Sequence, residues 1–177
     1  MNVIPTSLPG VLLLEPRVFP DARGFFLESY NRQAFAAAGI SCEFVQDNHS
    51  RSCRHTLRGM HYQLPPRAQD KLVRVLAGEI YDVAVDLRPD SPTFGRWEGF
   101  HLGADNFRML FIPKGFAHGF CVLSESADLF YKCSDLYAPD LQGGFRWDDP
   151  AVGITWPVTT PLLSDRDRAH PPFVRPP

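Results

Sequence analysis

The 177-residue sequence lacks the features that mark several specialised classes of protein. Its 18 basic and 20 acidic residues nearly balance, and no basic block suggests a nucleic-acid or membrane partner. No apolar run approaches transmembrane length, and the N-terminus does not have the charged and then apolar regions of a signal peptide. We therefore expect a cytoplasmic protein that binds neither nucleic acid nor membrane.

Cysteine is scarce. Cys42, Cys53, Cys121 and Cys133 are widely separated and form no C-x-x-C pair. A chain of this length can bury a core without disulfides, so reduced thiols are the expected state. A G-x-G-x-x-G segment is also missing, and the sequence therefore predicts no dinucleotide-binding loop.

The chain does contain many short apolar runs separated by glycine and proline. Residues 80–87 alternate between two faces, as a half-buried strand does. Other expected elements are strands at 25–30, 71–76, 109–112, 119–123 and 129–134, a helix at 31–38 that ends at Gly39, and a loosely held tail at 171–177. This pattern favours a mainly β domain, a β-sandwich or jelly roll with few short helices.

Two distant segments could together carry acid–base chemistry. Residues 57–63 (Leu-Arg-Gly-Met-His-Tyr-Gln) put His61 near Arg58, and Tyr131 lies on a later strand-like run. A histidine base and a tyrosine acid on opposite sides of one small molecule can remove and return a proton, as in an epimerase or isomerase. In a regular strand Arg58 and His61 would point to opposite faces, so we expect a bulge at Gly59.

Cationic residues and histidines raise two further hypotheses. Arg23, Arg58, Lys71 and Arg166 could bind an anionic ligand such as a phosphate, although the sequence does not show that they converge. Residues 113–118 (Pro-Lys-Gly-Phe-Ala-His) are similar to the second motif of the cupin superfamily. The stretch that would correspond to its first motif, His61-Tyr62-Gln63, lacks the second histidine of H-x-H. Two histidines without a close third ligand make a poor metal site, so we predict none.

Several segments, in order along the chain, closely resemble the dTDP-4-dehydrorhamnose 3,5-epimerase family. They are residues 19–30, 44–50, 57–63, 86–97, 112–120, 131–132, 146–150 and 163–167. Many independent motifs in one order are far more specific than a single short pattern. The resemblance implies a cupin-type jelly roll without cofactor or metal, forming a homodimer by N-terminal strand exchange. One domain would span 1–177, with the jelly-roll core at about 20–157 and a C-terminal segment at 158–177 that contributes Asp167.

The resemblance also implies roles for individual residues. His61 would be the general base, Tyr131 the acid on the opposite face, and Asp167 the partner that orients His61, with Asp165 of the same segment left open. Other implied substrate contacts are Arg23, Phe26, Glu28, Gln46, Asn48, Arg58, Lys71, His118, Tyr137, Gln142 and Arg166, and Phe19 joins Phe26 as a candidate for contact with the base or sugar. For His101 and His170 we expect ordinary packed or surface positions.

The implied reaction converts dTDP-4-dehydro-6-deoxy-D-glucose into dTDP-4-dehydro-L-rhamnose, with proton removal and return at C3 and C5. It belongs to dTDP-L-rhamnose, and hence carbohydrate and polysaccharide, biosynthesis. Gln142, Arg166 and the pair Leu136-Tyr137 depart from the family pattern, which leaves some substrate contacts open. The alternatives are a mono-epimerase or 3,4-ketoisomerase of a related dTDP-4-keto sugar, a metal-dependent cupin oxygenase, and a non-catalytic sugar-nucleotide-binding module.

Overall fold

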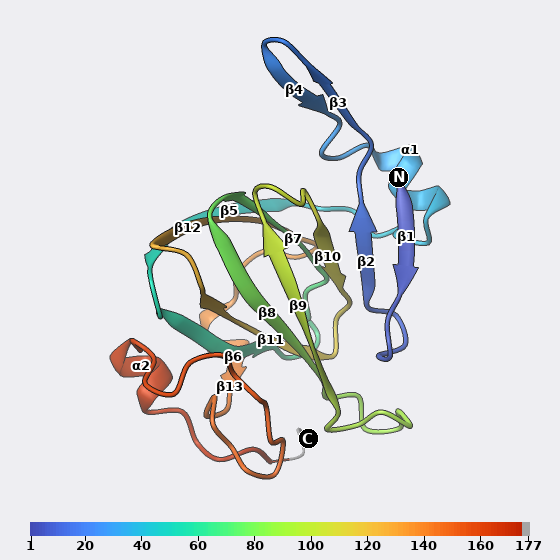
Figure 1. The fold of residues 1–177 in the computed structure, drawn as a ribbon. Coiled ribbons are helices and arrows are strands. Elements are labelled where there is room, and N and C mark those ends of the chain that lie inside the picture. The colour runs from blue at the N-terminus through green and yellow to red at the C-terminus, as the bar shows by residue number, and fades with distance from the viewer. Residues whose placement is uncertain (175–177) are drawn as a thin grey trace.

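Two antiparallel sheets face each other across a shared interior in a computed structural model that describes residues 1–174 (Figure 1). The larger sheet has the order β1 (Asn2–Pro5), β2 (Leu12–Glu15), β10 (Met109–Ile112), β7 (Lys71–Ala77), β12 (Ser126–Cys133), β5 (Gln46–Cys53). The smaller has the order β13 (Gln142–Gly144), β6 (Leu57–Gln63), β11 (Phe116–Val122), β8 (Glu79–Asp86), β9 (Trp97–Gly103). This confirms the expected mainly β, jelly-roll sandwich.

The core lies where the inward faces of the two sheets meet. Val73 and Leu129 come from the larger sheet, Ile80 and Ala84 from the smaller, and all four are almost fully buried in one cluster. Burying a side chain of valine or leucine size contributes about 1.5–3 kcal/mol. The alternation at 80–87 correctly predicted a strand, β8, but the strand is buried on both faces. Ile80 and Ala84 face the main core, and Val83 and Val85 on the other face are buried in a second cluster.

The predicted helix at 31–38 is α1 (Arg32–Ala37). The Asn31 side chain begins it by accepting hydrogen bonds from the N–H groups of Gln33 and Ala34, which the helix itself leaves unpaired. Gly39 follows the helix with a φ of +91°, a conformation typical of a helix stop. In residues 1–174 no helix is both long enough and apolar enough to cross a membrane.

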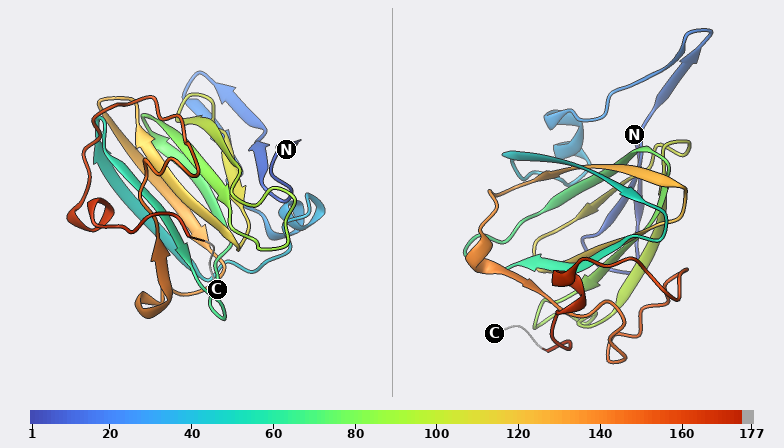
Figure 2. Two further views of the ribbon diagram at one scale, coloured as in Figure 1. Left: turned by 90° about the horizontal axis from the view of Figure 1, so that it is seen from below. Right: turned by 90° about the vertical axis from the view of Figure 1, so that its left-hand side faces the viewer.

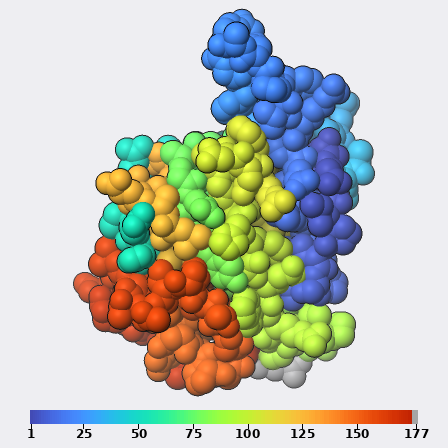
Figure 3. Space-filling view, viewed as in Figure 1, coloured from blue at the N-terminus to red at the C-terminus, as the bar shows by residue number. Residues whose placement is uncertain are grey.

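A hairpin of β3 (Val18–Asp21) and β4 (Gly24–Leu27) projects from the sandwich (Figures 1 and 3). The predicted strand at 25–30 therefore ends earlier, at Leu27. Phe19 and Phe26 pack against each other on this hairpin, and Phe26 keeps 67% of its surface exposed. An isolated hairpin is marginally stable in water, and its two exposed rings make it a candidate contact surface.

The C-terminal segment returns over the outer face of the smaller sheet and includes the short helix α2 (Asp165–Arg168), shown in Figure 2. Phe173 packs on Phe145 at 5.0 Å between ring centroids, and its N–H donates to Asp149 Oδ2 at 2.7 Å. The expectation of a loose tail from residue 171 is thus wrong as far as Phe173, because this aromatic anchors the chain. Residues 175–177 lie outside the described part.

The expected bulge in β6 is present. Arg58 pairs with Phe120 and His61 with His118, so Gly59 and Met60 together lie opposite the single residue Gly119. Residues directly opposite in an antiparallel pair share a face, and Phe120 points into the core. The extra residue therefore lets Arg58 and His61 point to the same side.

Only glycine fits at position 59. Its φ is +147°, and a Cβ atom built there would lie 2.6 Å from the Cα of Gly119. We predict that Gly59→Ala lowers the free energy of unfolding by about 2–6 kcal/mol, through backbone strain and overpacking together. Gly24→Ala is the matched control, because Gly24 has a similar φ of +131° but open space around it. Urea unfolding should show a cost of only about 1–3 kcal/mol for the control. Equal costs would contradict the close approach of the two strands.

Candidate active site

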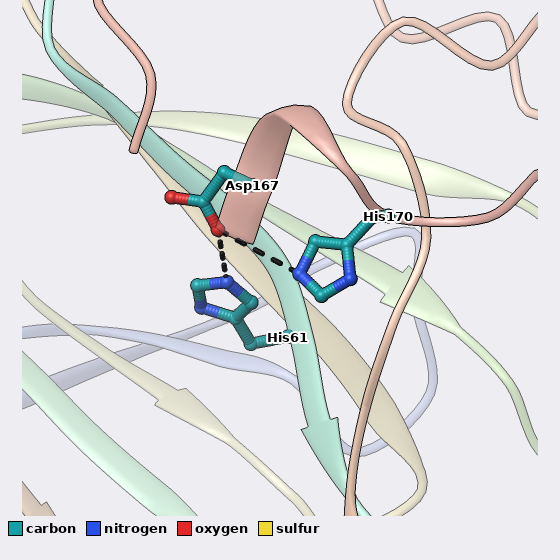
Figure 4. Close-up of side chains that lie close together, drawn as sticks. All are labelled: His61, Asp167 and His170. Atoms are coloured by element: carbon teal, nitrogen blue, oxygen red, sulfur yellow. Dashed lines mark hydrogen bonds and ion pairs between the residues drawn. The ribbon is translucent and has the colours of Figure 1, made fainter. Parts of the chain in front are cut away.

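A histidine and a carboxylate from distant parts of the chain form a close pair. The Nε2 of His61, on β6, lies 2.5 Å from Oδ1 of Asp167, on α2 (Figure 4). The Asp167 side chain is only 5% exposed, whereas that of His61 is 26% exposed. Because an ionised carboxylate only accepts hydrogen bonds, this contact favours the neutral tautomer of His61 with the proton on Nε2 and the lone pair on Nδ1. Of the two aspartates that the sequence left open, Asp167 is the one that contacts His61.

Ser164 fixes the position of Asp167. Its hydroxyl accepts the N–H of Asp167 at 3.1 Å, which caps α2, and also donates to Asp167 Oδ2 at 2.9 Å. Burial by itself raises the pKa of Asp167, but the hydrogen bonds from His61 and Ser164 outweigh it and hold the pKa below its ordinary value. The carboxylate therefore stays ionised beside the imidazole at neutral pH.

A cavity of about 220 Å³ opens between the two sheets beside this pair. His61 reaches it from the smaller sheet and Tyr131 from β12 of the larger sheet. Its wall also contains residues with polar groups, namely Gln46, Asn48, Tyr62, Gln63, Gln69, Lys71, Cys133, Tyr137 and Gln142. The two residues predicted to act as base and acid thus face one space from opposite sides.

A second cavity, of about 490 Å³, also has His61 in its wall. Three arginines, Arg51, Arg58 and Arg166, line it together with Asp167. Arg58 donates from Nε to the hydroxyl of Ser52 at 3.0 Å, which holds its guanidinium at the cavity wall. Converging arginines suit an anionic group such as a phosphate. Arg58 and Arg166, two of the cations proposed from the sequence, do meet here.

Burial shifts the titration of two cavity residues. It raises the pKa of Tyr131, and the nearby Cys133 adds to this effect while the Arg58 charge opposes it. Burial lowers the pKa of Lys71, against the opposing influence of Cys133 and of the carboxylate of Asp82. Tyr131 therefore remains a protonated phenol at neutral pH. The same burial disfavours the charged form of Lys71.

Comparison with known proteins identifies the family. The family model described as dTDP-4-dehydrorhamnose 3,5-epimerase matches residues 5–175. The chain is 55% identical to the Shigella flexneri dTDP-4-dehydrorhamnose 3,5-epimerase over 98% of this chain and 97% of the relative. The chain belongs to the dTDP-4-dehydrorhamnose 3,5-epimerase family.

Two solved structures of the family are very similar to this fold. The Bacillus anthracis dTDP-4-dehydrorhamnose 3,5-epimerase, with TDP and pyrophosphate bound, has a TM-score of 0.95 and 51% identity and covers 97% of this chain and 99% of that one. The Legionella pneumophila RmlC, in complex with dTDP-4-keto-L-rhamnose, has a TM-score of 0.93 and 47% identity and covers 97% and 92% of the two chains. The family of the chain is an epimerase family, as the sequence analysis predicted.

Other residues predicted to contact the substrate lie in different places. Tyr137 donates through its hydroxyl to Gln142 at 2.7 Å across the mouth of the first cavity. His118 is buried against Asp82, 3.0 Å from its Oδ2, and lines none of the described cavities. Its assignment to the substrate pocket stays a prediction.

The hairpin residues are remote from both cavities of their own subunit. Arg23 pairs with Asp21 at 2.7 Å while its side chain remains 90% exposed, and Glu28 accepts a hydrogen bond from Asn31. Phe26 is exposed beside them, and neither cavity includes any of the three predicted residues Arg23, Phe26 and Glu28.

Sequence reasoning missed His170 as a neighbour of the pair. Its Nε2 lies 3.6 Å from Asp167 Oδ1 (Figure 4), so His61, Asp167 and His170 could together hold a cation. The spacing of three residues after Asp167 in a helical stretch is the signal that could have found it. The sequence analysis treated it as an ordinary packed or surface residue, because it lacked the position of α2. Gln63 at the end of β6 and Gln69 in the loop before β7 were missed too, since single amides carry no specific pattern.

We predict that Ser164→Ala lowers the free energy of unfolding by about 0.5–2 kcal/mol, because α2 loses its N-cap. It should also raise the pKa of Asp167 towards its ordinary value, because Oδ2 loses a donor. Urea unfolding and NMR titration of the Asp167 carboxyl carbon would measure the two effects. Ser164→Thr is the control, because it retains the hydroxyl and should change both quantities little. An unchanged pKa in Ser164→Ala would show that Ser164 acts on the helix alone.

Proposed function

We propose that the protein converts dTDP-4-dehydro-6-deoxy-D-glucose into dTDP-4-dehydro-L-rhamnose by inverting C3 and C5. The observation that carries this proposal is that His61 and Tyr131 enter one cavity from opposite sheets. Membership of the epimerase family supports it. Inversion requires a proton to leave one face of a carbon and return to the other, so acid and base must flank the sugar.

His61 acts as the base in this proposal. C3 and C5 both neighbour the C4 ketone, so their hydrogens are weakly acidic. The Nδ1 of His61 takes the proton, and Asp167, held by Ser164, stabilises the imidazolium through Nε2–H. The lowered pKa of Asp167 supports this role, because a carboxylate that stays ionised can stabilise the positive ring.

The enolate that forms needs positive charge close to its oxygen. Lys71 lines the same cavity as His61, and Arg58 lies close enough to Tyr131 to affect its titration. Preorganised donors in comparable sites contribute about 2.7–4 kcal/mol each to the stability of an oxyanion. Partial burial of Lys71 makes its charge more effective, because less water screens it.

Tyr131 then returns a proton to the opposite face. Its raised pKa keeps the phenol protonated until the enolate forms, and Arg58 nearby stabilises the phenolate that remains. This cycle moves only protons and regenerates both residues through solvent. Its chemistry requires no electron carrier.

We infer that the nucleotide and sugar are held by several polar groups. Arg58 and Arg166 would bind the diphosphate, and Gln46, Asn48, Tyr137 and Gln142 would contact the sugar. We further propose a homodimer in which the hairpin of each subunit reaches the site of its partner. That arrangement explains why Arg23, Phe26 and Glu28 project away from their own cavities, as Figure 1 illustrates for the hairpin.

The cytoplasm remains our prediction for where this step of dTDP-L-rhamnose biosynthesis takes place. All four cysteines are free thiols in the structure, which suits a reducing compartment.

Proton NMR of the keto sugar nucleotide in D2O, with chelator-treated protein, tests the function. We expect deuterium to enter at both C3 and C5. His61→Asn should slow both exchanges by about 10²–10⁴-fold, and Tyr131→Phe should lose inversion more severely than exchange. His101→Asn is the control, because His101 is an exposed residue on β9.

Each other outcome would contradict the proposal in a distinct way. Exchange at a single carbon indicates a mono-epimerase. Exchange that disappears with the chelator indicates a metal enzyme, and binding without exchange indicates a sugar-nucleotide-binding module. Undiminished exchange in His61→Asn would rule out His61 as the base.

Mixed dimers test the exchange of hairpins. We expect that a hairpin variant carrying Arg23→Ala and Phe26→Ala, refolded together with His61→Asn, recovers activity, because one site of each mixed dimer then carries neither lesion. Random mixing should give about a quarter of the wild-type rate. Refolding His61→Asn with Tyr131→Phe is the control and should recover nothing, because each site keeps one lesion. A hairpin serving its own subunit predicts no recovery in either mixture.

A further inference from the structure

Three potential metal ligands converge on one side of the proposed active site. Oδ1 of Asp167 lies 2.5 Å from His61 Nε2 and 3.6 Å from His170 Nε2, and Figure 4 shows both imidazoles directed at this oxygen. The three ligand atoms all lie within 4.8 Å of one another. The proposed epimerisation uses His61 and Asp167 but gives His170 no task.

His170 is a buried imidazole without a hydrogen-bond partner. Its side chain is only 10% exposed, and its Nε2 makes no hydrogen bond to any described residue. This buried and unpaired ring nitrogen is the kind of atom that ligates zinc.

The surroundings make room for this ring. His170 contacts His61 edge to face at 5.4 Å between ring centroids. It also packs directly on Gly144, where a Cβ atom would collide with the imidazole. Gly144 is paired with His61 across β13 and β6, so a side chain there would push His170 away from the pair.

The cluster also has access from outside the substrate cavities. A third cavity, of about 260 Å³, is lined by Asp167 and His170 but not by His61 or Tyr131. Arg146 and Arg168 line it as well, and Asp148 offsets the charge of Arg146 through an ion pair at 2.9 Å. Arg166 lies on the side of the second cavity. An ion could therefore reach Asp167 and His170 without crossing the space proposed for the sugar.

Two imidazole nitrogens and one carboxylate oxygen form a ligand set typical of zinc and its neighbours. Metal–ligand lengths of about 2.0–2.1 Å place tetrahedral ligand atoms about 3.3–3.5 Å apart. The separation of 3.6 Å between His170 and Asp167 is close to this size. The contact between His61 and Asp167 has to open by about 1 Å. The ligand atoms of the two histidines, which lie within 4.8 Å of each other, have to approach, and water can fill the fourth position.

We propose that His61, Asp167 and His170 form an inhibitory binding site for a divalent metal ion of the zinc type. The metal takes the lone pair of His61 Nε2, so the ring proton moves from Nε2 to Nδ1. Nδ1 is the atom that accepts the substrate proton in the proposed mechanism, and the bound metal therefore blocks the base. The binding site stands on the geometry alone, whereas the inhibition rests on the proposed function.

Titration of metal-stripped protein with Co²⁺, followed by visible absorption, tests the site directly. We expect one ion per chain with the spectrum of a four-coordinate site, and displacement by Zn²⁺. His170→Asn should weaken Co²⁺ binding at least about tenfold. Mutating a residue that only orients a metal ligand already lowers the metal affinity by about this factor, and removing the ligand itself should lower it at least as much. The controls are His101→Asn and Cys53→Ser, which remove an exposed histidine and the exposed thiol and should leave binding unchanged. Circular dichroism would verify that His170→Asn is folded.

Zn²⁺ added to the deuterium-exchange assay tests the inhibition. We expect wild-type exchange to be inhibited over the range in which zinc displaces cobalt. His170→Asn should exchange at the wild-type rate without metal and need at least about tenfold more zinc for inhibition. Equal cobalt binding by His170→Asn, or binding that disappears in Cys53→Ser, would overturn the site. If metal binding depends on His170 but the protein shows no exchange activity, the metal site stands and the proposed function is disproved. If the zinc-bound protein exchanges at an unimpaired rate, the inhibition is disproved.

Discussion

The hydrogen bond between His61 and Asp167 is the constraint on which the arrangement of the site depends. It joins a strand in the first half of the sequence to a short helix almost at its end. Burying an ionised carboxylate is costly unless it is well paired, so the chain has to bring both donors to it. Ser164 supplies one donor and begins α2 in the same position, and the packing of Phe173 on Phe145 holds the segment that carries the helix. The C-terminal segment is therefore part of the site, although it adds no strand to either sheet.

How far the sequence predicts the structure depends on the range of the interactions involved. Strand β8 follows from local alternation and β10 from a short apolar run, and the N-cap of α1 is equally local. The bulge at Gly59 was predictable for another reason. In a regular strand Arg58 and His61 would point to opposite faces, so placing both in one site requires an irregularity between them, and a glycine is where a bulge is commonly found. The residue types of His61 and Tyr131 suggested a base and an acid, and the family resemblance supported that pairing. Their proximity could not be derived, because each lies on a different sheet and no local pattern encodes how sheets face each other. His118 and His170 show the limit most clearly. The neighbour of His118 is Asp82, which lies on another strand. The neighbour of His170 is Asp167, which lies on a helix of four residues that is too short to produce a periodic pattern in the sequence.

Polar residues inside a jelly roll oppose its stability, and the distribution of apolar residues shows how the conflict is confined. At one end of the interior the inward positions are Val73, Val75 and Leu129, and they are buried in the main cluster. Further along the same strands the inward positions become Lys71, Tyr131 and Cys133, which line the first cavity. The same strands thus provide a rigid apolar support at one end and a polar site at the other. Burial lowers the pKa of Lys71, and this is the energetic cost of the arrangement. Asp82, which is paired with His118 on the opposite sheet, partly offsets the effect because its carboxylate favours the charged form of Lys71.

A catalytic pair of this kind has an inherent weakness towards metal ions. An imidazole nitrogen and a carboxylate oxygen aimed at one proton are also two-thirds of a minimal zinc site, and the proton between them is what keeps a metal out. With only two protein ligands a metal ion binds weakly, so the pair alone does not form an effective metal site. A third imidazole changes this balance, because it completes the ligand set once His61 and Asp167 separate and the two histidines approach each other. Gly144 is the residue that permits this approach, since any larger side chain would occupy the space of the His170 ring. The identity of position 144 therefore determines whether the third ligand can approach, and position 170 determines whether it can bind a metal.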